Sequence, residues 1–565
     1  MMGLLQTKYD DDWLCDRFSF WIISSSNPIV NLLPLVARLI HSSSYSRSLS
    51  LPIRNRIDQD AKSWLTSPVG VTAMRPVPTP ARMRFKIFRL RFDIFRISPI
   101  VSPLLAVILF AALALVAVPA INYEPTIESL SQHPLPQWFA DAKLGIFIHW
   151  GLYSVPGWAP LVHPNHDFES TDYITHNPYA EWYLNSMRLE GSPTQAYHRE
   201  HYGANYDYYN FAPTFDDQIQ KWNPDAWAMI FQQAGAKYVV LTSKHHDGFT
   251  LWPSAIRNPS LPENRQHATR DIVGELAAAV RKQDLRMGLY YSGGYDWTFV
   301  PGPIRVAADY QSVKPQSAAY GAYVDAQMRE LINRYHPAAL WNDIDYPKSG
   351  HPLEIMADYY NTVPDGVIDD RFGVKHSDFK SPEYETLDKI SPLKWEECRG
   401  LGRSFGYNRA EGEAETIAPK DLIYLLVDIV SKNGNLLLDV GPEADGTIPP
   451  VQLSRLQALG KWLHQNGEAI YATTPWTRAS GATSNGTDIR FTRKDSAIYA
   501  ILLGQPKSSS ITIQSFSLNP HAKITILGQA EPLSWSAQGS GTKVDLPAKL
   551  PGDYAFALKI VGSGL

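Results

Sequence analysis

Amphipathic segments with helical spacing alternate with short apolar runs between about residues 129 and 476. In the clearest repeat, residues 223–235 begin with the Asn-Pro pair that starts a helix and end with the glycine that stops one, and residues 238–241 (YVVL) form the apolar run that follows. Helices that alternate with continuously apolar strands are typical of parallel strands buried under helices. Two further repeats pair a helix capped by Asp271 with the run 287–290, and a helix over 323–335 with the run 338–341.

The length of this region favours a barrel over a doubly wound sheet, because roughly 340 residues suit eight strand–helix units and the sequence lacks a Gly-rich dinucleotide fingerprint. After Trp476 only short alternating strands follow. We therefore predict an α/β chain with a (β/α)8-like TIM-type barrel over 126–475 and a small C-terminal antiparallel β-sandwich over 476–565. The sandwich would brace the barrel, with a sugar-binding role as the alternative. Its predicted strands are 489–491, 497–503, 510–513, 523–527, 543–546 and 554–561.

The N-terminal 125 residues contain a signal-like segment. Residues 104–118 (LLAVILFAALALVAV) are apolar and uncharged, follow a basic stretch and precede Pro119 and Ala120, which is the order of a signal peptide. Because the segment lies far from Met1, either translation starts near Met83 or the segment stays as an anchor over 97–123; prolines interrupt that span, so cleavage is favoured. We expect residues 1–125 to be a disordered extension, and the protein to be secreted or to reach a lysosome- or vacuole-like compartment. Membrane association is expected only if the segment is retained.

Composition narrows the class of partner. A net charge of -4 and a pI near 6.5 provide no basic surface for nucleic acid. Aromatic residues make up 12% of the chain, and flat apolar rings suit the C–H faces of a sugar as well as a large core. With two cysteines, Cys15 and Cys398, the fold has no disulfide framework. The sequon at residues 485–487 (NGT) is compatible with the secretory route.

Polar and aromatic residues follow the apolar runs. In a barrel the active site lies where the strands end, so we expect these side chains to surround one mouth. Imidazoles, indoles and stacking rings suit a sugar with several hydroxyls, and two carboxyls that flank a glycosidic bond can hydrolyse it. Spacing alone does not choose that pair. The segments are 149–151 (HWG), 244–248 (KHHDG), 290–294 (YYSGG), 341–343 (WND), 369–373 (DDRFG) and 439–442 (DVGP).

The same regions closely resemble the α-L-fucosidases of glycoside hydrolase family 29, in that family's order, from about Ser129 to the C-terminus. The resemblance implies a (β/α)8-like barrel followed by a β-sandwich, a retaining reaction, and no metal or other cofactor. It implies a fucosylated oligosaccharide or glycoprotein glycan as the partner. The matching segments are WFADAKLGIFIHWGLYSVPGW (138–158), KYVVLTSKHHDGFTLW (237–252), GLYYSGGYDW (288–297), LWNDIDYP (340–347), DDRFGVKHSDFKSPEYET (369–386) and SKNGNLLLDVGPEADGTIP (431–449).

Two catalytic carboxyls follow from the resemblance. The nucleophile is the Asp of the family's WND motif, which falls on Asp343; a structural aspartate that pairs with Arg371 is the alternative interpretation. Asp345 is a second carboxylate nearby, on a chain that we expect to turn after Asp343. The general acid/base falls on Glu383, in an expected loop, by resemblance to family members with an HxDFK...EY segment. Its alternatives are Glu396, Glu397 and Asp378.

The resemblance also implies the substrate contacts. Glu181 and the histidines would bind ring hydroxyls, while aromatic rings would enclose the C5 methyl that distinguishes fucose from galactose. Arg371 would hold Asp343 ionised, because a nearby cation favours the charged form. The implied contacts are His149, Glu181, Trp182, His245, His246, Tyr290, Trp341 and Arg371.

Two other functions stay open from the sequence. A metal-dependent barrel hydrolase would use His149, His245, His246 and Asp247, but neighbouring histidines are expected to point to different faces, and metal sites commonly show a better-spaced third ligand. A catalytically inactive sugar-binding protein would keep the pocket without turnover, although both candidate carboxyls are present. The sequence leaves open the linkage, the aglycone and whether the protein is a homo-oligomer.

Overall fold

The computed structural model describes residues 122–161 and 170–562. The apolar segment 104–118 and the rest of the predicted extension up to residue 121 lie outside the described residues. Within the described ranges, no helix combines the length and the apolar character needed to cross a bilayer.

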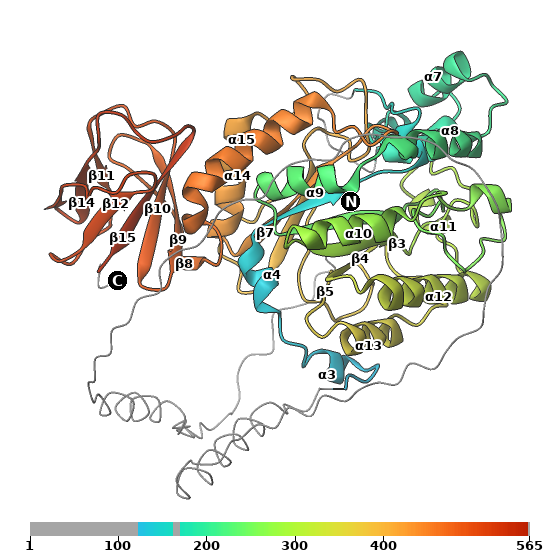
Figure 1. The fold of residues 1–565 in the computed structure, drawn as a ribbon, viewed down its shortest axis with the longest axis horizontal. Helices are drawn as coiled ribbons and strands as arrows, with labels where there is room; N and C mark the ends of the chain where they lie inside the picture. Colours follow the sequence, from blue (N-terminus) through green and yellow to red (C-terminus); the bar gives the residue numbers. More distant parts are fainter. Residues whose placement is uncertain (1–121, 162–169, 563–565) are drawn as a thin grey trace, which may run out of the picture. The chain divides into compact units, whose positions relative to one another are not determined.

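The main sheet consists of seven parallel strands in the order β5-β4-β3-β2-β1-β7-β6. Figure 1 labels β3, β4, β5 and β7 of this sheet, with helices such as α9, α10 and α12 beside it. From β1 to β5 each strand pairs with the next along the chain, and β7 pairs with the other side of β1. This is the pairing of a TIM-type barrel. The strands are β1 Leu144–Ile148, β2 Tyr238–Lys244, β3 Arg286–Ser292, β4 Ala339–Asp343, β5 Val367–Ile368, β6 Trp395–Gly400 and β7 Gly434–Val440.

An irregular segment, residues 378–384, fills the place between β5 and β6. The backbone N–H of Asp378 donates to Ile368 O of β5 at 2.9 Å. On the other side, Lys380 N donates to Lys394 O at 3.1 Å and Cys398 N donates to Pro382 O at 3.0 Å. The ring therefore has the eight positions of the predicted (β/α)8-like barrel, but segment 378–384 takes one of them instead of a regular strand.

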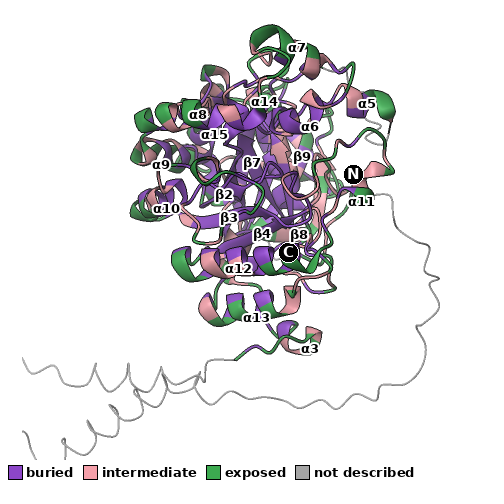
Figure 2. Cartoon of the chain, turned by 90° about the vertical axis from the view of Figure 1, so that its right-hand side faces the viewer, coloured by how far each residue is buried: buried purple, intermediate pink, exposed green. Residues whose placement is uncertain are grey.

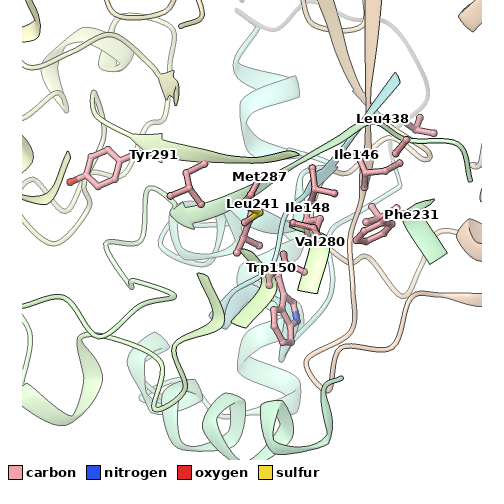
Figure 3. Close-up of a cluster of buried hydrophobic side chains, with 14 of the residues drawn as sticks. Ile146, Ile148, Trp150, Phe231, Leu241, Val280, Met287, Tyr291 and Leu438 are labelled. Atoms are coloured by element: carbon pink, nitrogen blue, oxygen red, sulfur yellow. The ribbon is translucent and has the colours of Figure 1, made fainter. Parts of the chain in front are cut away.

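Alternate residues of each strand face two different layers. On β1, Ile146 and Ile148 lie in the core between sheet and helices, whereas Phe147 lies in a smaller core inside the barrel. Because both faces are buried, strands such as β1 (LGIFI) are apolar along their length. Figure 2 shows buried strands enclosed by helices with exposed outer faces. Figure 3 shows members of the outer core, among them Ile146, Ile148, Trp150, Phe231, Leu241, Val280, Met287, Tyr291 and Leu438.

Capping residues mark the starts of several helices, among them α9, α10 and α12. Asn223 Oδ1 accepts the N–H of Ala226, and Gly235 follows the helix with φ of 93°. The helix predicted over 323–335 begins earlier, at Ala318, because Ser317 caps it through the N–H of Tyr320. The longer helices are α9 Pro224–Gln233, α10 Ile272–Lys282, α12 Ala318–Tyr335, α13 Pro352–Thr362, α14 Pro419–Ser431 and α15 Pro450–Asn466. The shorter ones are α3 Ile127–Leu130, α4 Gln137–Ala142, α5 Thr171–Thr175, α6 Tyr183–Met187, α7 Pro193–His201, α8 Ala212–Gln218 and α11 Asp309–Ser312.

The C-terminal strands form two antiparallel sheets, of five and three strands. Two of these strands were not predicted: β8 contains Pro475 and lies at an edge, and β13 is a short, largely exposed edge strand, so neither has a buried alternating pattern. The core under the barrel helices continues into Tyr499 and Ala557 of the larger sheet, so the boundary at residue 475 stays a prediction. The strands are β8 Thr474–Ala482, β9 Asp488–Lys494, β10 Ala497–Leu503, β11 Ser510–Ile513, β12 Lys523–Ile526, β13 Trp535–Gln538, β14 Gly541–Asp545 and β15 Ala555–Val561.

Candidate active site

A cavity of about 290 Å³ lies at the carboxyl ends of the barrel strands. Strand alternation explains its lining, because Phe147 and His149, and likewise Trp341 and Asp343, are two residues apart and face the barrel interior together. All ten residues that the sequence predicted for the site line this cavity. They are His149, Glu181, Trp182, His245, His246, Tyr290, Trp341, Asp343, Arg371 and Glu383.

Both carboxylate oxygens of Asp343 have partners. Tyr290 donates its hydroxyl to Oδ2 at 2.8 Å, and Arg371 Nη1 donates to Oδ1 at 2.9 Å. Burial alone would raise the pKa of Asp343, but the charge of Arg371 and these hydrogen bonds outweigh it and hold the pKa below its ordinary value. The geometry therefore keeps an ionised carboxylate at the tip of β4.

The chain turns sharply after Asp343, as the sequence suggested. Ile344 and Asp345 have φ of 61° and 72°, a left-handed conformation that is strained for a β-branched residue. Gly294 makes room for the turn, because a Cβ at this position would lie 1.7 Å from Ile344 O. Asp345 pairs with Lys314 at 2.5 Å and does not line the cavity. The turn thus separates the two acids and leaves Asp343 facing the cavity.

Glu383 reaches the cavity from the irregular segment 378–384. Its Oε2 lies 3.5 Å from both Nη1 and Nη2 of Arg371, and its Oε1 accepts the hydroxyl of Tyr179 at 3.3 Å. Its side chain is 27% exposed, compared with 11% for Asp343. Glu383 is therefore the more solvent-exposed of the two carboxyls.

The three alternatives to Glu383 lie away from the cavity. Glu396 accepts hydrogen bonds from Tyr238 and from Trp341 Nε1. Glu397 faces Arg399 Nη1 at 3.6 Å. Asp378 is held by His133 and by the hydroxyl of Tyr360. None of the three lines the cavity.

The prediction that neighbouring histidines point to different faces was wrong for His245 and His246. Strand β2 ends at Lys244, so strand alternation does not apply beyond it, and both rings line the cavity with centroids 3.9 Å apart. Burial lowers the pKa of His149 and of His246 to about 3, so both imidazoles are neutral near neutral pH. Among the described residues, no three His, Cys, Asp or Glu side chains are grouped as metal ligands are.

Hydrogen bonds fix the orientation of the other polar residues. His149 Nδ1 lies 2.7 Å from Asp439 Oδ1, and His246 Nδ1 lies 2.7 Å from Ser292 Oγ. Glu181 accepts the N–H of Gly406 at 2.8 Å. The sequence did not indicate several other lining residues; Tyr179 could have been inferred, because it lies two residues before Glu181. These additional residues are Phe147, Tyr173, Asn177, Tyr179, Tyr295, Ala307, Tyr310, Gln311, Lys314, Ile344, Cys398 and Phe405.

We predict that the folded protein loses stability as the pH rises through about 7 to 8. Burial raises the pKa of Glu181 to about 8 and the pKa values of Glu396 and Glu411 to about 7. The folded chain therefore holds protons that an unfolded chain, with glutamate pKa values near 4.3, has released, and the free energy of unfolding falls as pH increases. Thermal unfolding midpoints at pH 6 and pH 8 measure this, and Glu181→Gln, which cannot ionise, should show a smaller fall. A midpoint that rises over this interval would contradict the prediction.

Comparison with known proteins agrees with this geometry. The model of the α-L-fucosidase family matches residues 111–468, and that of the α-L-fucosidase C-terminal domain matches residues 483–561. Tissue α-L-fucosidase of Rattus norvegicus is 37% identical over 460 residues, 78% of this chain and 92% of that protein. Tissue α-L-fucosidase of Homo sapiens is 35% identical over 465 residues, which are 79% of this chain and 93% of that protein.

Solved structures agree as well. The Thermotoga maritima α-fucosidase in complex with fucose is 44% identical, has a TM-score of 0.72, and covers 78% of this chain and 100% of its own. The chain therefore belongs to the α-L-fucosidases of glycoside hydrolase family 29.

Proposed function

We propose that the protein is a retaining α-L-fucosidase that removes terminal α-L-fucose from oligosaccharides or glycoprotein glycans, with Asp343 as nucleophile and Glu383 as general acid/base. The observation that carries this proposal is that both carboxyls contact the same guanidinium nitrogen, Arg371 Nη1, at 2.9 Å and 3.5 Å. The two oxygens are therefore closer than about 6.5 Å, the shortest separation typical of inverting glycosidases, which need room for a water molecule between them.

The reaction takes two steps. First, a carboxylate oxygen of Asp343 bonds to the anomeric carbon while the glycosidic bond breaks, and Glu383 gives its proton to the leaving oxygen. The product is a fucosyl ester of Asp343. Second, Glu383 takes a proton from water, the water oxygen bonds to the anomeric carbon, and the ester bond breaks to release fucose. Both side chains return to their starting protonation states.

Arg371 suits both steps. Before the reaction its charge is balanced by Asp343, which it holds ionised. Once the ester forms, Asp343 carries no charge, and the guanidinium then faces Glu383 as its nearest carboxylate. An uncompensated cation favours the ionised form of a neighbouring acid, and that is the form needed to activate water.

The remaining lining supports a deoxy sugar as the substrate. Neutral His149 and His246 each offer one hydrogen-bonding nitrogen, and buried Glu181 offers a carboxyl group, for the ring hydroxyls. Trp182 and Tyr295 both line the cavity and pack edge-on against each other, and these two rings provide apolar surface for the C5 methyl. The fucose complex of the Thermotoga maritima relative supports the same class of ligand.

The proposal extends to the compartment. The basic stretch followed by the apolar segment 104–118 supports secretion or delivery to a lysosome- or vacuole-like compartment. Asn485, in the sequon 485–487, is exposed in the turn between β8 and β9. An accessible asparagine in a surface turn is a suitable acceptor for an N-linked glycan.

We predict that Asp343→Gly lowers turnover of an aryl α-L-fucoside by about 10³-fold or more, because the ester can no longer form. Azide fits the space that the carboxylate leaves, so it should restore activity or give a fucosyl azide. Lys380→Met is the matched control, since this largely exposed lysine pairs with Asp370 and not with either catalytic carboxyl. Near-normal turnover by Asp343→Gly would refute the nucleophile assignment.

We predict that Arg371→Met moves the acidic limb of the kcat/KM pH profile upward by about one unit or more. Without the guanidinium, burial dominates and raises the pKa of Asp343, so the nucleophile is protonated at higher pH. Activity should then be lost at acidic pH values that the wild type tolerates. The pH profile is measured with an aryl fucoside, and Lys380→Met serves as the control variant. An acidic limb that does not move in Arg371→Met would argue against the role of Arg371 in keeping Asp343 ionised.

We predict that the protein from a eukaryotic secretory cell carries one N-linked glycan, at Asn485. Mass spectrometry before and after peptide N-glycosidase treatment should show one glycan, and Asn485→Gln and Thr487→Ala should each remove it. A secreted wild-type chain of unmodified mass would exclude this modification.

A further inference from the structure

Two tyrosines stand beside Glu383 and have no role in the reaction described above. The hydroxyl of Tyr179 donates to Glu383 Oε1 at 3.3 Å. Tyr173 lies beside Tyr179, near enough for its hydroxyl to be affected by the Glu383 carboxylate. Both tyrosines line the cavity. One tyrosine hydroxyl therefore contacts an oxygen of the proposed acid/base, and a second tyrosine lies next to it.

The two oxygens of Glu383 have different partners on different elements. Oε1 accepts the hydroxyl of Tyr179, and Oε2 faces the guanidinium of Arg371. The backbone beside Glu383 is fixed as well, since Tyr384 N donates to Cys398 O at 3.1 Å. Each carboxyl oxygen of Glu383 thus has its own hydrogen-bond donor, and the neighbouring backbone is held as well. These contacts orient the plane of the carboxyl group and therefore the direction in which it presents its proton.

Tyr179 belongs to a rigid part of the cavity wall. Its N–H donates to Asn177 Oδ1 at 2.8 Å, and the next N–H, of Ala180, donates to Ser404 Oγ at 2.9 Å. Its ring packs edge-on against Phe405 with centroids 5.7 Å apart. Glu181 and Trp182 follow directly, in the 3-10 helix η2 (Ala180–Trp182). The proposed sugar contacts Glu181 and Trp182 and the hydrogen-bond donor to Glu383, Tyr179, thus lie in one short segment, residues 179–182.

Tyr179 does not change its charge in the working pH range. Burial raises the pKa of Tyr179 and of Tyr173, so both stay neutral hydroxyls. The other charged or titratable groups around Glu383 include Arg371, the Cys398 thiol of β6, the Tyr384 hydroxyl and the Glu181 carboxyl; Arg403 lies near Tyr173. A neutral donor orients the carboxyl without adding a charge that would compete with Arg371.

We infer that Tyr179 is a positioning residue that orients Glu383 toward the oxygen of the leaving group. The inference rests on the proposed role of Glu383 as general acid. The effect of losing Tyr179 should depend on the substrate. A leaving group that departs as a stable anion needs little proton transfer, whereas a leaving alkoxide must be protonated by the general acid. Loss of orientation should therefore slow hydrolysis of alkyl fucosides more than that of nitrophenyl fucosides.

The test compares kcat/KM for methyl and 4-nitrophenyl α-L-fucoside in Tyr179→Phe and Glu383→Gln. Tyr179→Phe should lose about tenfold on the methyl fucoside and about threefold or less on the nitrophenyl fucoside. Tyr295→Phe is the matched control: it removes another cavity hydroxyl, which donates to Tyr310 O, and should change both substrates by the same factor.

Glu383→Gln distinguishes a failure of the positioning role of Tyr179 from a failure of the proposed acid role of Glu383. If Glu383→Gln is selectively impaired on the methyl fucoside and Tyr179→Phe is not, the positioning role is wrong and the proposed function stands. If Glu383→Gln affects both substrates equally, Glu383 is not the acid, and the assignment on which the inference rests is wrong. Selective impairment in both variants, with none in Tyr295→Phe, supports the inference.

Discussion

The guanidinium of Arg371 is the point at which the barrel wall, the proposed nucleophile and the proposed acid/base meet. It binds Asp343, faces Glu383, donates to Ser381 Oγ at 3.1 Å and to Ser381 O at 2.9 Å, and lies over the ring of Trp341 at 4.5 Å from its centroid. Breaking a buried ion pair from one side costs about 3 to 5 kcal/mol, because the remaining charge is left without a partner. Asp343 and Arg371 therefore require each other in this cavity.

This cation also explains why an irregular segment in the barrel wall is tolerated. Residues 378–384 occupy the place of a strand between β5 and β6, with fewer regular hydrogen bonds than a strand would have. Ser381 of that segment holds Arg371, and Glu383 of the same segment faces it. Through these contacts the segment brings the Glu383 carboxyl to the cavity that Asp343 also lines.

The sequence predicted the parts of the fold that local signals determine. Asn223 and Gly235 set the limits of α9 through capping and a positive φ, and the apolar runs became strands because both sheet faces are buried. The site residues were found through motifs, and the barrel brings all ten to one cavity. What could not be predicted depends on contacts between distant segments. The turn at Ile344 needs the space beside Gly294, and the position of Tyr179 next to Glu383 joins residues far apart in the chain.

The cavity meets two opposed electrostatic requirements. Its burial keeps other titratable groups neutral: the pKa of His149 is lowered to about 3 and the pKa of Glu181 is raised to about 8. The same burial acts against the one ionised group that nucleophilic attack needs, because desolvation raises the pKa of a carboxyl. A general increase in polarity would charge the neutral groups as well. Arg371 and the Tyr290 hydroxyl instead act on Asp343 directly, at hydrogen-bonding distance, so this carboxylate stays ionised beside a histidine and a glutamate that burial keeps neutral.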